Sequence, residues 1–293
     1  MSSKKNSRKQ TSSAGRNIAS IIFSFLLAVV FTLIGLLMLI WVVRSPEYVT
    51  KATDDEYIAY LQAYIEESAA DYTLPTSIDV KVLEGIFDAK KIKDDTILEV
   101  QALHSGIEFT PDTSSMEDQL TANVQAFFEE NGLAVDEEGQ EIIDVYVSEI
   151  MDIYASSIQI PGLPAFFTLS SQYGRYLLFG LGGAVIFAII LIILCIISQK
   201  WAHKGLRYVA YASGGAFLMS LAAPLVLYIT GIYKKLQLNP QFLYYGAMNL
   251  IRNLLQSFFL VAAVWLVITI ILAIIVAALR KRAIHKGHHH HHR

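Results

Sequence analysis

Four long apolar stretches constrain the fold of this chain more than any other feature. They contain no Asp, Glu, Lys, Arg or His, and they cover residues 18–43, 176–198, 208–233 and 254–279. A helix needs about 20 consecutive apolar residues to cross the hydrocarbon core of a bilayer. The chain as a whole is 54% hydrophobic and only 17% charged, which is too apolar for an ordinary soluble domain. We therefore predict an all-α integral membrane protein with four transmembrane helices.

The acidic residues are confined to one part of the chain. All 26 lie between Glu47 and Asp152, inside a segment of residues 44–172 that separates the first two apolar stretches. This segment holds six Lys or Arg residues, so its formal net charge is −20. It is long enough to form its own core, and we predict an acidic extracytoplasmic domain inserted between transmembrane helices 1 and 2. Residues 173–279 then hold helices 2–4.

Positive charges set the expected orientation, because short loops rich in Lys and Arg stay on the cytoplasmic side. Thirteen Lys and Arg residues lie in the basic tail of residues 1–17, in the loop between the second and third stretches, and in the His-rich tail of residues 280–293. Both termini are therefore expected in the cytoplasm. No small-x-small cleavage site follows the first stretch, so we interpret it as a retained signal anchor.

The acidic segment has the periodicity of helices. Apolar residues recur every three or four positions over 57–69, which predicts a first helix there. The same periodicity predicts another helix from about Asp136 to Tyr154. The spacing of Ser114 and Glu117 is that of a capping box, which predicts the start of a second helix that stops at Asn131-Gly132. Residues 78–103 are expected to be mostly helical, but residues 78–82 alternate between apolar and polar, so a short strand is the alternative there.

Residues that carry enzymatic chemistry are scarce. The acidic segment has one histidine, His104, and no cysteine, and no glycine-rich phosphate loop occurs in the chain. Residues 136–141 are acidic but lack the alternating oxygen ligands of a calcium loop. We therefore expect no enzymatic activity, cofactor or metal. The missing disulfides and glycosylation acceptors favour a Gram-positive bacterial plasma membrane.

Histidines at the C-terminus form the one weak candidate for metal binding. A run of neutral imidazoles can bind nickel or zinc, but a flexible tract has no fixed geometry that would select a metal. A purification tag and a solvated tail are the alternatives. The candidate ligands are His288, His289, His290, His291 and His292.

A polar stripe at the start of the fourth stretch is the candidate ligand site. Asn249, Arg252, Asn253 and Gln256 are spaced at i, i+3, i+4 and i+7, so a helix that opens at Asn239-Pro240 would place them on one face. Such a stripe at membrane depth must face protein, water or headgroups. It could form a ligand or lipid pocket, or Arg252 could simply extend to lipid phosphate while the amides hold helices together.

Partner binding or sensing by the extracytoplasmic domain is the function that we expect. The alternative is a subunit of a transporter or channel, which would not be coupled to protons or sodium by an intramembrane carboxylate, because the stretches contain none. Expected partners are membrane lipid and a protein that binds the acidic domain, with no nucleic acid. We also expect the acidic domain to dock against positive residues outside the membrane, namely Arg175, Lys234, Lys235 and Arg252.

Overall fold

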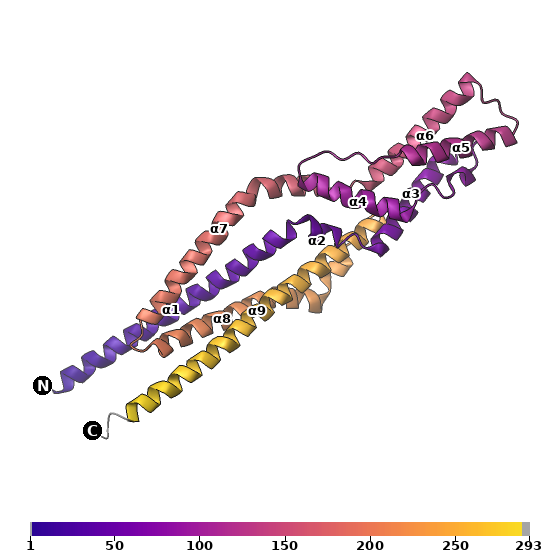
Figure 1. The fold of residues 1–293 in the computed structure, drawn as a ribbon. Coiled ribbons are helices and arrows are strands. Elements are labelled where there is room, and N and C mark those ends of the chain that lie inside the picture. Colours follow the sequence, from indigo (N-terminus) through magenta and orange to yellow (C-terminus); the bar gives the residue numbers. More distant parts are fainter. Residues whose placement is uncertain (1, 289–293) are drawn as a thin grey trace. The chain divides into compact units, whose positions relative to one another are not determined.

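The computed structural model describes residues 2–288, and it describes side chains for residues 15–282. All regular elements in the described range are helices (Figure 1). The chain divides into two compact units. The bundle unit consists of Met1–Val43, Gly174–Ile232 and Leu254–Arg293, and the acidic unit consists of Arg44–Tyr173 and Tyr233–Asn253.

Four helices in the described part of the chain are long and apolar enough to cross a membrane, as the sequence predicts. They are α1 (Ser2–Val43), α7 (Leu163–Ile197), α8 (Ala202–Thr230) and α9 (Gln241–His288). These four apolar helices suggest a multi-pass membrane protein. The helices α7 and α9 begin well before the apolar stretches at 176 and 254, because their first turns belong to the acidic unit.

Small residues let the helices of the bundle unit approach closely. The helix α1 packs along α8, and Gly215 on α8 lies where an added Cβ would be 3.1 Å from the Cβ of Ala28. A Cβ on Gly35 would come within 2.8 Å of Val261 on α9. The ring of Phe31 stacks on Trp265 with centroids 4.6 Å apart, so α1 holds both partners by van der Waals packing.

Polar side chains join the helices at one end of the bundle unit. The hydroxyls of Ser20 and Ser198 lie 2.7 Å apart, and the Gln199 amide donates to the same Ser20 oxygen over 2.7 Å. The Ser24 hydroxyl donates to the carbonyl of Tyr208. These contacts bring the part of α1 around Ser20 to the connection between α7 and α8, so Arg16 and the basic residues of that connection lie at the same end of this unit.

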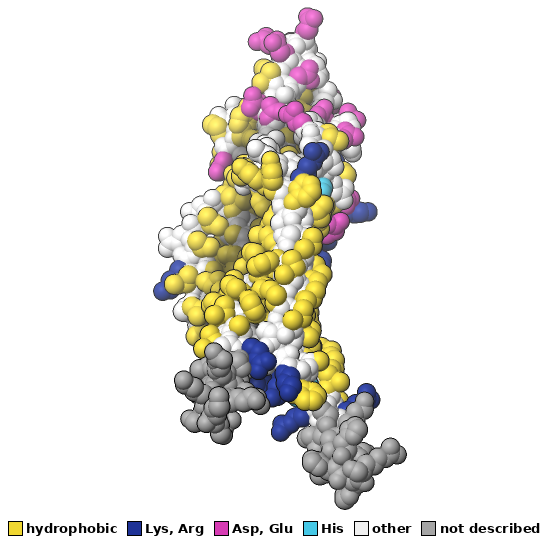
Figure 2. Space-filling view, turned by 90° about the vertical axis from the view of Figure 1, so that its left-hand side faces the viewer, with side chains coloured by type: hydrophobic (Ala, Val, Ile, Leu, Met, Phe, Trp, Pro, Cys, Tyr) yellow, Lys and Arg dark blue, Asp and Glu magenta, His cyan; other side chains and the backbone are white. Residues whose placement is uncertain are grey.

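The surface of the bundle unit is dominated by hydrophobic side chains. Figure 2 shows them over much of the visible face of the spans, with a group of Lys and Arg side chains at the lower end of the view. Ile186 is 63% exposed and Leu260 is 66% exposed, although both lie in the middle of apolar helices. Such side chains are stable at a surface only if that surface meets an apolar environment.

The acidic unit is built from helices that bury one apolar face each. They are α2 (Pro46–Thr50), α3 (Asp55–Thr73), α4 (Ala89–His104), α5 (Ser114–Glu130) and α6 (Glu137–Ile158), with a 3₁₀ turn at Val80–Leu83. A second 3₁₀ turn, Ile232–Lys235, begins with the last residue that the bundle unit contributes before Tyr233. Leu61, Ile65, Leu120, Ile143 and Ile150 are fully buried. Their spacing along α3, α5 and α6 is the periodicity that the sequence shows.

The mostly helical prediction for residues 78–103 is confirmed over the strand alternative, and one local prediction, the capping box, is corrected. Residues 78–82 form no strand, because Asp79 caps the 3₁₀ turn by accepting from the Lys81 amide over 2.9 Å. The helix α5 does begin at Ser114, but Thr113 occupies the cap position and no capping box forms. Asp112 instead accepts hydrogen bonds from both the amide and the hydroxyl of Ser114.

The segment Tyr233–Asn253 completes the core of the acidic unit, a role that the sequence does not predict for it. Phe242 is 4% exposed and packs edge to face against Tyr57, with ring centroids 5.7 Å apart. Tyr245 stacks on Tyr60 at 4.1 Å, and their hydroxyls are hydrogen bonded. A Cβ on Gly246 would lie 3.1 Å from the Tyr57 ring, so the helix backbone fits closely there.

The expected ionic docking of this segment is not what holds it. The ion pairs within the described side chains join Lys91 to Asp95 and Lys93 to Asp55, and neither involves Lys234, Lys235 or Arg252. Aromatic burial therefore attaches the segment Tyr233–Asn253 to the acidic helices.

Candidate functional site

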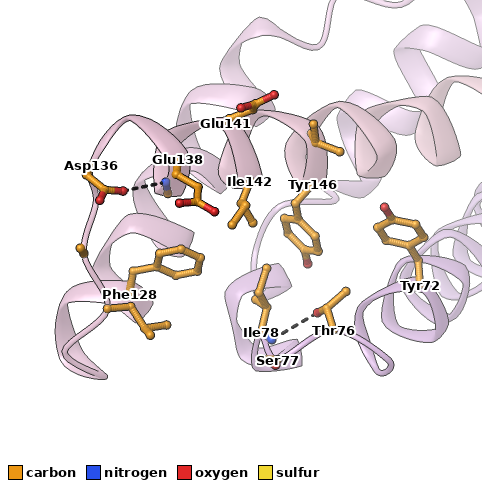
Figure 3. Close-up of a pocket in the computed structure, with 14 residues that line it drawn as sticks. Tyr72, Thr76, Ser77, Ile78, Phe128, Asp136, Glu138, Glu141, Ile142 and Tyr146 are labelled. Atoms are coloured by element: carbon orange, nitrogen blue, oxygen red, sulfur yellow. Dashed lines mark hydrogen bonds between the residues drawn. The ribbon is translucent and has the colours of Figure 1, made fainter.

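An open groove of about 790 Å³ lies where α3 ends and the turn between α5 and α6 begins. Figure 3 shows Ile142 and Tyr146 of α6 pointing toward Ile78 across it, with Phe128 on one side and Tyr72 on the other. The lining residues, which we call the distal groove, are Tyr72, Thr76, Ser77, Ile78, Phe128, Leu133, Ala134, Asp136, Glu138, Gly139, Glu141, Ile142, Val145 and Tyr146.

Backbone geometry in the turn between α5 and α6 shapes the distal groove. Gly132 has a φ of 68°, a conformation that other residues rarely adopt. Asp136 caps α6 by accepting from the Gly139 amide over 3.0 Å (Figure 3). A Cβ on Gly139 would collide with the carbonyl oxygen of Ala134, so only glycine allows the turn to fold this closely against the helix.

The distal groove exposes apolar side chains to solvent. Leu133 is 47% exposed, Ile142 is 51% exposed and Val145 is 56% exposed. Tyr146 is instead fixed at the base of the groove, where its hydroxyl lies 2.7 Å from that of Thr73, and burial raises the pKa of its phenol. A rigid base with exposed apolar walls is typical of a surface that binds a partner.

Carboxylates surround these apolar walls. Asp136, Glu138 and Glu141 line the distal groove, and all three are exposed. None of the residues that line the groove is Lys or Arg, and the sequence contains neither between Lys93 and Arg175. The potential around the groove therefore favours a positively charged ligand, while its walls favour an apolar one.

The four residues of the polar stripe predicted on α9 differ in how far they are buried. Asn249 is 9% exposed, and its amide donates to the Ala52 carbonyl over 3.1 Å, so it holds the chain segment that follows α2. Asn253 is partly buried, whereas Arg252 and Gln256 are exposed. The first three belong to the acidic unit and Gln256 belongs to the bundle unit.

The predicted histidine ligands lie at the edge of what the structure describes. Only the backbone of His288 is described, and His289, His290, His291 and His292 lie outside the described residues. Among the described side chains, no group of three or more His, Cys, Asp or Glu residues is arranged to hold a metal ion.

Buried polar residues on α4 form a second feature, which sequence reasoning missed. Asp95 is 2% exposed and accepts hydrogen bonds from the Tyr154 hydroxyl at 2.6 Å and from Lys91 Nζ at 2.7 Å. Glu99, one turn further along α4, is 4% exposed, and burial raises the pKa of its carboxyl. Burial also raises the pKa of the nearby Tyr57 phenol, and the negative charge of Glu99 adds to that increase.

The hydroxyl of Tyr57 is the one buried side-chain polar atom without a hydrogen-bond partner among the described residues. The spacing of Asp95 and Glu99 at i and i+4 is a signal that both lie on one face of α4. It does not reveal that this face is buried.

No family model, curated protein or solved structure matches this chain.

Proposed function

We propose that this protein is a multi-pass plasma membrane protein whose acidic unit lies outside the cytoplasm and binds a protein partner without catalysing a reaction. The distal groove is the binding surface in this proposal. Its preferred ligand is a cationic amphipathic segment, whose apolar side chains would cover Leu133, Ile142 and Val145 while its Lys or Arg residues meet the surrounding carboxylates.

One observation carries this proposal: exposed apolar side chains are combined with exposed carboxylates, and with no lining Lys or Arg, in a groove that has a rigid base. An acidic surface alone would keep the unit soluble and would need no ligand. The exposed apolar walls reduce solubility unless something covers them, so the combination favours a binding function over simple solvation.

Binding of a defined peptide tests the proposed groove. The full chain in zwitterionic nanodiscs would be titrated with a fluorescent helical peptide of Lys and Leu, and the signal from empty discs would be subtracted. We expect saturable binding that weakens as salt is added, because salt screens exposed charges. A Glu and Leu peptide of the same length should not bind.

The decisive variant removes the apolar walls and keeps the charge. Ile142→Gln combined with Val145→Gln should weaken binding of the Lys and Leu peptide at least tenfold. The matched control is Leu98→Gln, because Leu98 is 48% exposed on α4 and lies outside the distal groove. Equal affinities of the double variant and the control would rule out the groove as the binding surface.

Orientation is tested separately with single cysteines in a Cys195→Ser background. Cysteines placed at His104 and Lys235 should react with an impermeant thiol reagent on intact cells, and a cysteine at Lys204 should not. The basis is the distribution of Lys and Arg residues over the termini and the loop between α7 and α8. Labelling at Lys204 would reverse the proposed topology.

A further inference from the structure

A second cavity lies within the acidic unit, at the start of α7 and α9. Its volume is about 310 Å³, near the lower limit of about 300 Å³ for small-molecule sites. The lining residues, which we call the basal cavity, are Val49, Ala52, Thr53, Tyr57, Ile160, Pro161, Leu163, Leu238, Leu243, Gly246, Ala247 and Leu250. All of them belong to the acidic unit.

The lining of the basal cavity is almost entirely hydrocarbon. Thr53 and Tyr57 supply the only side-chain polar atoms, and the Thr53 hydroxyl already donates to the carbonyl of Thr50 over 2.9 Å. A buried water needs two to four polar partners to be held firmly. The Tyr57 hydroxyl is then at most one free polar partner, which is too few to hold a water firmly, so the lining favours an apolar ligand.

One face of α9 forms a wall of the basal cavity. Leu243, Gly246, Ala247 and Leu250 are spaced at i, i+3, i+4 and i+7, and they lie roughly a third of a turn from the polar stripe that contains Asn249. Gly246 brings the α9 backbone against the Tyr57 ring, which keeps this wall in place. The polar stripe thus borders the basal cavity and does not line it.

The position of the basal cavity along the chain indicates where its ligand comes from. Val49 follows the end of α1 by six residues, Leu163 is the first residue of α7, and the α9 wall lies in the first turns of that helix. All three helices are candidate membrane spans. Chain continuity therefore places the cavity next to the ends of the spans, where the apolar tails of membrane lipids are the most abundant apolar ligands.

We propose that the basal cavity holds an acyl chain of a membrane phospholipid. The acyl chain of the lipid would pack between the segment after α2, the start of α7 and the first turns of α9. Its apolar contacts would join these three protein segments. The acidic unit would then carry a lipid as a bound ligand, which is independent of the partner that the distal groove is proposed to bind.

Photo-crosslinking in the full chain tests this directly. The protein would be placed in phosphatidylglycerol nanodiscs containing a trace of phospholipid with a diazirine in the acyl chain, irradiated, digested and mapped by mass spectrometry. We expect crosslinks in residues 49–53 and 238–250, in addition to crosslinks in the lipid-exposed part of α9 around Leu260. The label around Leu260 provides an internal standard in each sample.

Filling the cavity should remove the first set of crosslinks only. Ala247→Leu should lower the label in residues 49–53 and 238–250 at least fivefold relative to the label around Leu260. The matched control, Ala122→Leu, makes the same change at an exposed position of α5 and should leave the ratio unchanged. Equal ratios in the two variants would overturn the proposal.

A second variant covers the possibility that Ala247→Leu does not fold. Leu238 is 39% exposed at the edge of the basal cavity, so Leu238→Glu adds a charge there with little effect on the core. It should also lower the cavity label at least fivefold. The proposal is also overturned if these residues react with a free alkyl diazirine but not with the phospholipid probe, because the ligand would then be a different amphiphile.

Discussion

The two units of this chain distribute polar and apolar residues in opposite ways. In the bundle unit, Ser20 and Ser213 are fully buried while large aliphatic side chains are exposed. In the acidic unit, large aliphatic side chains fill the core and most carboxylates are exposed. Polar groups avoid hydrocarbon surroundings and apolar groups avoid water. The side-chain distribution of the bundle unit therefore suits hydrocarbon surroundings, and that of the acidic unit suits water.

The units also differ in how they use the polar groups that they bury. The bundle unit pairs neutral hydroxyls, and Thr269 on α9 donates to the Ser213 hydroxyl on α8 over 2.9 Å. The acidic unit buries two carboxyl groups on α4, one of which has two hydrogen-bond donors while the other is affected mainly by desolvation. Single substitutions should separate these cases by the size and the pH dependence of their effects.

The largest effect is expected where the segment Tyr233–Asn253 contributes Phe242 to the core of the acidic unit. Phe242→Ala should destabilise the acidic unit by about 3–5 kcal/mol, because a large side chain leaves a cavity against Tyr57 and Tyr64. Hydrogen exchange of the α3 amides in the full chain measures this loss. The control Leu260→Ala removes an exposed apolar side chain of the bundle unit and should leave α3 protected. Equal α3 exchange in both variants would exclude Tyr233–Asn253 from the core.

A smaller effect is expected at Asp95. Tyr154→Phe removes one of the two donors to this buried carboxylate, which should cost about 2 kcal/mol, in the range for hydrogen bonds to charged groups. Chemical denaturation monitored through exchange of the α6 amides measures it. Asp95→Asn with Tyr154→Phe should cost less than the sum of the two single variants, since they share one contact. Strict additivity would show that the two groups do not interact.

At Glu99 the expected effect depends on pH. Burial raises the pKa of this carboxyl in the folded state, so the folded protein keeps the proton to higher pH than the unfolded chain does. The stability that the proton contributes is present below the usual glutamate pKa and is lost as pH rises through the raised folded pKa. Glu99→Gln should therefore flatten the loss of thermal stability as the pH rises above the usual glutamate pKa, while Glu130→Gln, at an exposed site, should not. An unchanged slope for Glu99→Gln would contradict this.

The smallest effect is expected between α8 and α9 in the bundle unit. Thr269→Val removes the hydrogen bond to Ser213 and keeps the shape of the side chain, and it should cost about 0.6 kcal/mol, the average for such bonds in membrane helices. Unfolding in mixed micelles, compared with Thr230→Val at an exposed helix end, measures this difference. A loss of several kcal/mol would show that hydroxyl contacts stabilise the bundle unit as strongly as aromatic burial stabilises the acidic one.

The sequence alone determined the four apolar helices and the separation of charge. Both properties depend on composition over about 20 neighbouring residues, which is the length scale of a membrane helix. It also determined α3, α5 and α6, because their buried residues repeat with the helical period. The first turns of α7 were missed, since they lie outside its apolar stretch and their helical structure belongs to another packing environment. The start of α9 at Gln241 agrees with the helix that the sequence predicts to open at Asn239-Pro240.

Only the tertiary structure decided which distant residues meet. Asn249 belonged to a proposed ligand stripe in the sequence, but its amide donates to Ala52, which is 197 positions away. Phe242 was part of a connecting segment, and its burial depends on Tyr57 and Tyr64. The distal groove and the basal cavity likewise arise from segments that come together only in the folded chain. Local periodicity shows which face of a helix is apolar, but only long-range packing decides whether that face is covered, left open or closed around a cavity.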